Sequence, residues 1–561
     1  MINPEKKPAT ENPWYVLATL IIESDKIVVS EARRYWNAWA SQEMTKEEKA
    51  AIKNREGKSI LSDAPEWEFV REEVERLFKQ RLPKTKLPRP TEKVDFSGFE
   101  FSNDIRFTGF FFPAIIYFDS AKFSGMASFE DTTFSGRASF MDATFSDAHF
   151  SSATFSGEAF FMNATFSGMA SFEDTTFSGD AYFMNATFSG EANFGRATFS
   201  GMARFEETTF SGNASFMDAT FSRTAIFEET TFSGNAYFSI ATFSREAHFM
   251  NATFSGMAMF EKTTFSGDAH FSSARESFSG DAHFSSARFS SEAHFTSATF
   301  SREAHFMNAT FSGAASFNDA TFSGMARFEK TTFSGYAHFI SATFSGPSKF
   351  ISTKFSKAAN FSDVVFDAPC DLGDAEFVIA YPNLSGTLLH SKTNVTAENK
   401  YWPNARIEQS NNDDNYVSES CAHLRQNMAS QGLTEAAHFF FRREMDHKAK
   451  LSRWWERPFY EVYRWAEYGH GVWQPLVGIF LLWLSGALSL IYWGSLHWTT
   501  ALGLAAANIF KFFGFQRVYF EDDVIGKLNP YLQSMTAAQT VIGYFLLFLL
   551  GLGLRNRFRL K

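Results

Sequence analysis

Cysteine is scarce in this chain of 561 residues, where Cys370 and Cys421 are the two present. Two thiols cannot build the disulfide framework of a small secreted domain, and their number suits a reducing compartment. The N-terminus also lacks a charged start followed by a long apolar run, since its nearest apolar stretch, residues 15–22, has eight residues. We therefore expect no secretory signal.

Basic residues are also fewer than acidic residues. The chain has 52 Lys and Arg against 62 Asp and Glu, a formal net charge of −10. A general nucleic-acid binder needs a basic footprint, so no direct binding of nucleic acid is expected. The sequence also shows no nucleophile–base pair, phosphate loop or specific metal-ligand spacing. We therefore predict that the protein is not an enzyme and holds no cofactor and no metal.

Phenylalanine, by contrast, is abundant, with 70 Phe against 16 Tyr and 12 Trp. Between about Phe96 and Phe366 it recurs at alternating gaps of five and six within an eleven-residue unit, such as AYFMNATFSGE from Ala181. Each Phe usually follows Ala or Thr by two positions. Positions i−2 and i of a strand share a face, so each triplet predicts a short strand with Phe inward and its middle residue outward. The Ser-Gly pairs predict corners in which Gly supplies positive φ.

Two units, or 22 residues, make a closed coil with four short faces and four corners. Stacked coils satisfy one another's strand hydrogen bonds, and the repeat is long enough for about 12 coils. Phe205 and Phe227 should lie in adjacent coils about 5 Å apart. The 22-residue spacing predicts four Phe ladders in the core, two of which contain Phe161, Phe183, Phe205, Phe227 and Phe249, and Phe166, Phe188, Phe210, Phe232 and Phe254.

The A-x-F-x-x and A-T-F-S-G-x pattern resembles the pentapeptide-repeat family, in the Phe-centred variant where alternate pentapeptides carry one extra residue. The resemblance covers about half the chain. It implies a mainly β fold, a right-handed quadrilateral parallel β-helix that we assign to residues 96–380. One departure is residues 274–278, where two extra residues should bulge a corner outward.

Histidine recurs at outward positions of the repeat. The spacing makes His283 and His305 neighbours on one face, and the two extra residues make His270 and His294 neighbours on another. Imidazoles one coil apart are compatible with a shared metal ion, but we favour a solvated strand face. The outward histidines are His248, His270, His283, His294, His305 and His338.

Acidic residues outnumber basic residues in the repeat, 27 against 16 between Phe96 and Phe366. Some pentapeptide-repeat proteins resemble DNA in size and charge and bind topoisomerases. The excess here is about one charge per coil, whereas DNA carries one per ~1.7 Å of its axis. A DNA mimic that binds a topoisomerase is therefore our third functional hypothesis.

Residues 1–95 lie outside the repeat and predict three short helical segments with Trp and Leu anchors. Pro83, Pro88 and Pro90 end the last segment. The elements NPWYVLATL and WNAW resemble the N-terminal segment of membrane-linked bacterial pentapeptide-repeat proteins. We interpret this segment as a cap, because the end of a β-helix would otherwise expose unpaired strand edges.

The C-terminal part predicts helices and a membrane hairpin. Residues 381–470 form a polar linker and juxtamembrane helices, which break at Gly432 into an αα-hairpin. Residues 471–561 contain two uncharged apolar stretches of spanning length. The predicted spans are residues 473–493 and 537–554, with a re-entrant or interfacial helix at residues 497–515 between them.

Basic residues flank the two spans, from Arg442 to Arg464 before the first and from Arg555 to Lys561 after the second. The positive-inside rule then places both termini and the β-helix in the cytoplasm. The ending LLFLLGLGLRNRFRLK is similar to the tail of many membrane pentapeptide-repeat proteins. Together with the family resemblance, this predicts the bacterial inner membrane as the location.

These patterns favour a membrane-anchored scaffold or protein-interaction protein. Its partners would be the lipid bilayer, an unidentified protein on a β-helix face, and other copies of the chain through helix-mediated homo-oligomerisation. The alternative is an oligomeric channel-like protein with the β-helix as a sensory or gating domain, although no T-V-G-Y-G-like filter is present.

Overall fold

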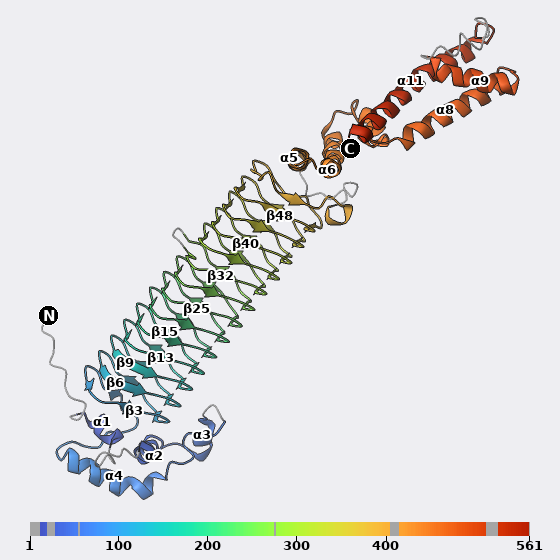
Figure 1. The fold of residues 1–561 in the computed structure, drawn as a ribbon. Helices are drawn as coiled ribbons and strands as arrows, with labels where there is room; N and C mark the ends of the chain where they lie inside the picture. Colours follow the sequence, from blue (N-terminus) through green and yellow to red (C-terminus); the bar gives the residue numbers. More distant parts are fainter. Residues whose placement is uncertain are drawn as a thin grey trace. The chain divides into compact units, whose positions relative to one another are not determined.

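The computed structural model describes residues 12–19, 29–53, 57–273, 277–403, 414–511 and 525–559. The chain forms two compact units, Met1–Pro403 and Asn404–Lys561, and Figure 1 labels their elements. In the first unit, a parallel β-solenoid of about 14 turns runs from β1 (Val94–Asp95) to β50 (Asn394–Val395). The predicted β-helix fold is confirmed. In the part of the chain before it that the structure describes, there are four helices: α1 (Pro13–Ala18), α2 (Val29–Ala40), α3 (Lys46–Ala51) and α4 (Trp67–Arg81).

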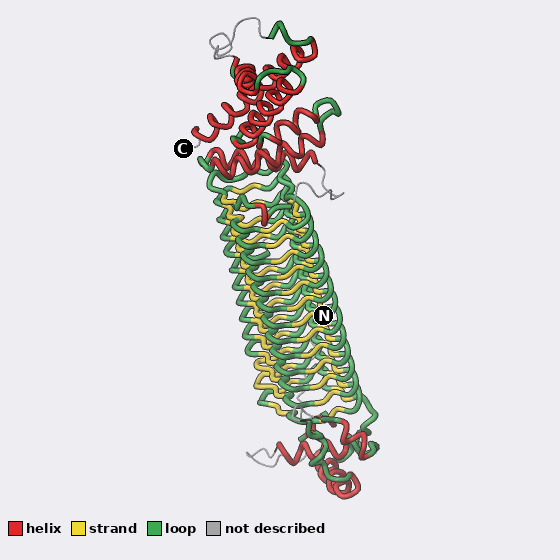
Figure 2. The backbone as a smooth tube through the Cα atoms, turned by 90° about the vertical axis from the view of Figure 1, so that its right-hand side faces the viewer, coloured by secondary structure: helices red, strands yellow, loops and turns green. Residues whose placement is uncertain are grey.

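A typical coil of the solenoid is built from four very short strands. One coil contains β15 (Ala181–Tyr182), β16 (Thr187–Phe188), β17 (Ala192–Asn193) and β18 (Thr198–Phe199). Most strands pair in parallel with their equivalent 22 residues later, as in Thr187 with Thr209 of β20 (Thr209–Phe210). Two of the faces are 13-stranded parallel sheets, and Figure 2 shows the strands in yellow with loop at every corner. Strands too short to be stable alone are held by their stacked neighbours.

Phenylalanine fills the solenoid in stacked ladders. Phe205 is fully buried, and its ring lies 4.8 Å from that of Phe183 and 4.9 Å from that of Phe227, with the planes within 2° of parallel. Neighbouring ladders meet edge to face, as in Phe183 with Phe194 at 5.4 Å and 90°. Both arrangements are favourable for aromatic rings, and each buried Phe contributes about 1.5–3 kcal/mol. All ten Phe residues expected in two of the ladders are at most 2% exposed: Phe161, Phe183, Phe205, Phe227, Phe249, Phe166, Phe188, Phe210, Phe232 and Phe254.

The positive φ predicted for glycine at the corners is found at other residues in most coils. Positive φ falls on the residue two positions after a Phe, as in Asn163 (φ 57°) and Asp174 (φ 58°), where short polar side chains tolerate the left-handed region. The Ser-Gly corners from Gly125 to Gly346 do not have positive φ, whereas Gly98 and Gly386, near the two ends of the solenoid, do. At Gly201 there is no room for a side chain, because a Cβ would lie 2.3 Å from the carbonyl oxygen of Gly179 in the preceding coil. Glycine therefore allows close stacking at these corners and does not supply an unusual dihedral angle.

The two-residue insertion leaves the ladders intact. Phe254 pairs with Phe278 and Phe278 with Phe300, so a step of 24 residues is followed by one of 22. The ring of Phe278 stacks at 5.0 Å on Phe254 and at 4.9 Å on Phe300. The predicted bulge itself involves residues 274–276, which lie outside the described residues.

The solenoid continues beyond the boundary predicted at residue 380. Asn394 and Val395 of β50 pair with Asp371 and Leu372 of β48 (Cys370–Leu372). The indole of Trp402 then lies 5.1 Å from the ring of Phe377. The polar composition of residues 381–415 predicts a linker there, but this last turn buries Leu384 and Val395 in place of Phe.

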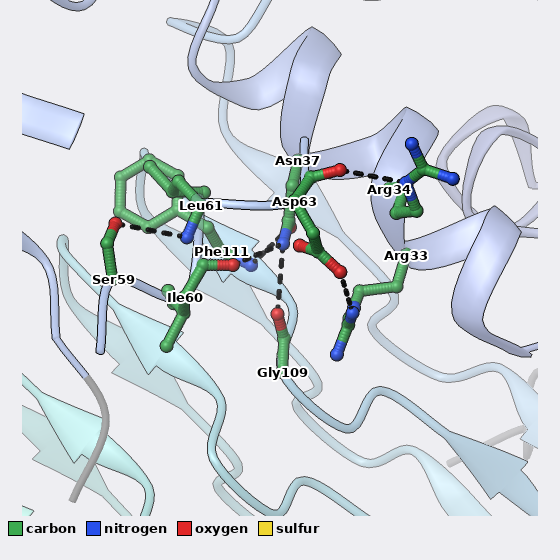
Figure 3. A network of polar contacts seen from close by, with 9 residues as sticks. All are labelled: Arg33, Arg34, Asn37, Ser59, Ile60, Leu61, Asp63, Gly109 and Phe111. Carbon is green, nitrogen blue, oxygen red and sulfur yellow. Dashed lines mark hydrogen bonds and ion pairs between the residues drawn. The ribbon is translucent and has the colours of Figure 1, made fainter. Parts of the chain in front are cut away.

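The N-terminal helices cover the first coils. The indole nitrogen of Trp36 on α2 donates to the carbonyl of Phe111 at 2.7 Å. The amide of Asn37 accepts from Phe111 N–H at 2.9 Å and donates to the carbonyl of Gly109 at 3.0 Å, as Figure 3 shows. Because β4 (Phe111–Phe112) is the edge strand of its sheet, the Asn37 side chain bonds it as a neighbouring strand would. A salt bridge between Arg33 and the Asp63 carboxylate and a hydrogen bond from Arg34 to the Asp63 carbonyl join α2 to the loop before α4.

The second unit is helical in its described part. An αα-hairpin of α5 (Asp414–Ser430) and α6 (Thr434–Leu451) turns at Gly432, whose φ is 77°. Its salt bridges include Arg425 with Glu444 at 2.7 Å. The remaining elements are α7 (Arg457–Trp465), η3 (Glu467–Gly469), α8 (Trp473–Tyr492), α9 (Trp498–Ile509) and α11 (Pro530–Arg559).

Candidate functional site: outward ladders and an apolar helical module

The outward residues differ between the faces of the solenoid. Two faces present nearly uniform Thr ladders, such as Thr176, Thr198 and Thr220. The other two present varied side chains, because the middle residue of each A-x-F triplet varies. The first variable face carries Tyr182, Arg204, Ile226, His248, His270, His294, Ser316 and His338. The second carries Asn193, Ser215, Tyr237, Met259, His283, His305, Arg327 and Lys349.

The histidines stack within these variable faces, at the places that the spacing predicts. On the first face the ring of His270 lies 4.9 Å from that of His248 and 4.8 Å from that of His294. On the second, His283 and His305 stack at 4.6 Å. Within the described residues, no group of three His, Cys, Asp or Glu side chains is placed to hold a metal ion. The structure therefore presents these histidines as stacked outward rings, three on the first face and two on the second.

Stacking and partial burial disfavour protonation of the ladder. Burial, and next the charges of His294 and His248, lower the pKa of His270. Burial, and next the charge of His283, lower the pKa of His305, and burial lowers that of His338. A lowered pKa means that the folded state binds fewer protons than the unfolded chain when the pH falls below about 6.5.

The solenoid should therefore lose stability as the pH is lowered from 7 towards about 5, where unfolded histidine takes up its proton. Replacing His270 and His305 by Gln should make this loss smaller. Thermal melts of the full chain in detergent across this range measure the effect. His149→Gln is the control, since His149 faces Ser171 in the next coil. An equal pH dependence in the double variant and the parent would contradict the assignment.

The repeats in this solenoid match a known family. A family model described as pentapeptide repeats (9 copies) matches residues 150–198, 185–231, 227–275, 277–321, 308–347 and 328–376. The solenoid is a pentapeptide-repeat domain. Comparison with the curated proteins and with the solved structures finds no match. The matched segments together cover residues 150–376 except residue 276.

The helical module contains two helices that are long and apolar enough to cross a membrane, α8 and α11. The first matches its predicted span, and the second begins seven residues before the predicted residue 537. Only 22% of the apolar window in α8 and 28% of that in α11 is buried within the chain. Large apolar side chains are exposed along both helices, among them Phe480, Leu481, Val541 and Phe548.

The helix predicted between the spans is α9, and it packs into the module. Its residues Ala501, Leu504 and Ala505 are fully buried together with Ala487 and Leu490 of α8. Residues 512–515 of the predicted segment lie outside the described residues. Because α9 buries this face against its neighbours, its side chains complete the core of the bundle.

One buried polar cluster joins the three helices, and the sequence reasoning missed it. The amide nitrogen of Gln539 on α11 donates to the carbonyl of Leu482 on α8 at 3.2 Å and to that of Ala505 on α9 at 3.3 Å. Its oxygen accepts from Asn508 at 3.3 Å. Gly486 makes room for it, since a Cβ there would lie 2.2 Å from the Gln539 nitrogen. Polar side chains that face the interior of an apolar bundle hold its helices together.

Proposed function

We propose that this protein is a membrane-anchored scaffold, in which α8 and α11 hold a pentapeptide-repeat domain at the cytoplasmic face of the bacterial inner membrane. The two variable faces of the solenoid bind a protein partner, and the bundle associates with further copies of the chain. No catalytic step is assigned to it.

The observation that carries this proposal is the exposed apolar surface of α8 and α11. A core helix of a soluble protein would be mostly buried, whereas about three quarters of each apolar window faces outward. In water, such a surface would expose many large apolar side chains. In a bilayer, the same side chains contact lipid, and the polar residues Asn508 and Gln539 face inward.

The orientation follows from the charges at the two ends of the spans. Basic residues precede α8 and end α11, where Arg555 and Arg557 are exposed. The segment between the spans, residues 494–529, has three basic and three acidic residues. The positive-inside rule then places the ends of the chain in the cytoplasm.

Cysteine labelling tests this orientation, because both native thiols are buried and burial raises the pKa of each to about 12. Lys527→Cys places a thiol between the spans and Arg557→Cys places one at the end of α11. A membrane-impermeant maleimide added to intact cells should label the Lys527→Cys chain, and should label the Arg557→Cys chain only after permeabilisation. The parent chain sets the background, and the reverse pattern would overturn the orientation.

A further inference from the structure

An apolar stripe runs along the outside of α7. Trp455 lies in the turn before α7, and Phe459, Val462 and Trp465 follow it at spacings of four, three and three, so these three residues share one face of the helix. Phe459 is 76% exposed, and the other three are between 42% and 47% exposed. Trp454, in the turn before the helix, is 77% exposed. This pattern is the reverse of a helix that packs on a soluble core, where the apolar face is the buried one.

Hydrogen bonds from α7 and η3 to α6 fix this orientation of the stripe. The guanidinium Nε of Arg464 donates to Asp446 of α6 at 2.8 Å. The hydroxyl of Tyr468 also bonds Asp446, and the ring of Tyr463 lies 5.3 Å from that of Tyr468. Rotating the stripe inward would break these bonds. The outward direction of the apolar face is therefore built into the packing of α7 on α6 and η3.

Contacts also place α7 at the end of the spans where α8 begins and α11 finishes. A Cβ on Gly478 of α8 would lie 2.9 Å from the ring of Trp465. Asn556 of α11 donates to the carbonyl of Gly469 in η3 at 2.9 Å. Trp473, at the first position of α8, is 71% exposed. The stripe is thus continuous with the apolar surface of the spans.

Basic groups surround the stripe. Arg453 and Arg457 are exposed beside it, and Arg555 and Arg557 are exposed at the end of α11. The Arg453 guanidinium lies 5.1 Å from the centre of the Trp455 ring. Three exposed acids lie nearby, and each has a partner. Glu461 pairs with Arg464 at 2.8 Å, Glu456 accepts from the backbone of Arg453 at 3.3 Å, and Glu467 accepts from Gln474 at 2.6 Å.

We propose that α7 and the Trp454–Trp455 turn lie in the lipid–water interface, where the stripe contacts the upper acyl chains and the arginines bind the phosphates of anionic lipids. Aromatic residues concentrate at this depth, and a helix with an apolar and a basic face lies in the plane of the interface. The inference rests on the anchoring function proposed above. It makes α7 a second membrane contact, parallel to the surface, beside the spans.

The test compares single-cysteine labels in the full chain. Phe459→Cys, on the stripe, and Glu461→Cys, on the polar side of the same helix, each receive an environment-sensitive fluorophore. Phe548→Cys, on the exposed side of α11, reports the span. Each labelled protein is reconstituted into vesicles of phosphatidylcholine and phosphatidylglycerol, or of phosphatidylcholine alone. Quenchers are a nitroxide near the carbonyl end of the acyl chain and aqueous iodide.

At Phe459→Cys, we expect lipid nitroxide quenching about twofold or more above that at Glu461→Cys, with protection from iodide. The lipid quenching should fall in vesicles without phosphatidylglycerol. Equal quenching at the two α7 positions, or no effect of the anionic lipid, would overturn the inference. Protection from iodide without lipid quenching would indicate a covering protein or second copy and would overturn it as well. Absence of lipid quenching at Phe548→Cys would instead overturn the anchoring function.

Discussion

Phe205→Asp should unfold the coils around it, with a loss of at least about 4 kcal/mol in the free energy of unfolding. Removing a buried Phe costs about 3–5 kcal/mol, and a carboxylate without a partner in this apolar core adds to that cost. The ring of Phe205 stacks between Phe183 and Phe227 and meets Phe216 edge to face at 5.4 Å. Denaturation of the full chain in detergent, followed by its far-ultraviolet circular dichroism, measures the loss.

The control for this change is the adjacent residue. Arg204 points outward, is partly exposed and pairs with Glu206 at 2.6 Å. A surface ion pair contributes about 0–1 kcal/mol, so Arg204→Ser should be almost neutral. Equal effects of the two substitutions would mean that the inward and outward assignments of the A-x-F triplet are wrong.

Replacing Trp36 and Asn37 together by Ala should release the N-terminal helices from the solenoid. Trp36 is fully buried, and loss of a buried Trp costs about 3–5 kcal/mol. Loss of the Asn37 amide leaves Phe111 N–H and the Gly109 carbonyl without these partners, at about 1–3 kcal/mol for each group that stays buried. Amide hydrogen exchange should accelerate in residues 94–112 and remain slow near Phe205, because each coil contacts only its neighbours.

An exposed strand edge also favours pairing between molecules, so the double variant should form larger assemblies as its concentration is raised. Phe69→Ala is the control, since it deletes an aromatic ring of α4 that is 84% exposed. Unchanged exchange in residues 94–112 of the double variant would show that these helices do not protect the first coils.

Sequence periodicity predicts the solenoid well because every coil repeats the same local interaction. The 22-residue spacing of Phe161 and Phe183 translates directly into rings 4.8 Å apart. Departures occur where the repeat ends. The turn containing Val395 has no Phe. Before the repeat, where three helical segments are predicted, the described residues form the four helices α1 to α4, and α3 is capped by Thr45 with Glu48.

The candidate sites were only partly predictable. Stacking of His270 on His294 follows from counting residues, because the two-residue insertion sets their register. The hydrogen bond from Phe111 N–H to the amide oxygen of Asn37 does not follow in this way, since its partners lie 74 residues apart and no local pattern relates them. No local sequence pattern predicts the roles of Gln539 and of the stripe on α7 either. Their roles depend on which helix face packs inward, and that is decided by tertiary contacts with Asn508 and Asp446.

Extraction of membranes with alkaline carbonate tests the central claim most directly. This treatment opens membranes into sheets and releases proteins that are bound only to their surface. If α8 and α11 cross the bilayer, the wild-type chain should remain in the membrane pellet, together with a known spanning protein and apart from a surface-bound one. Recovery of the intact, folded chain in the supernatant would contradict a membrane-anchored pentapeptide-repeat scaffold.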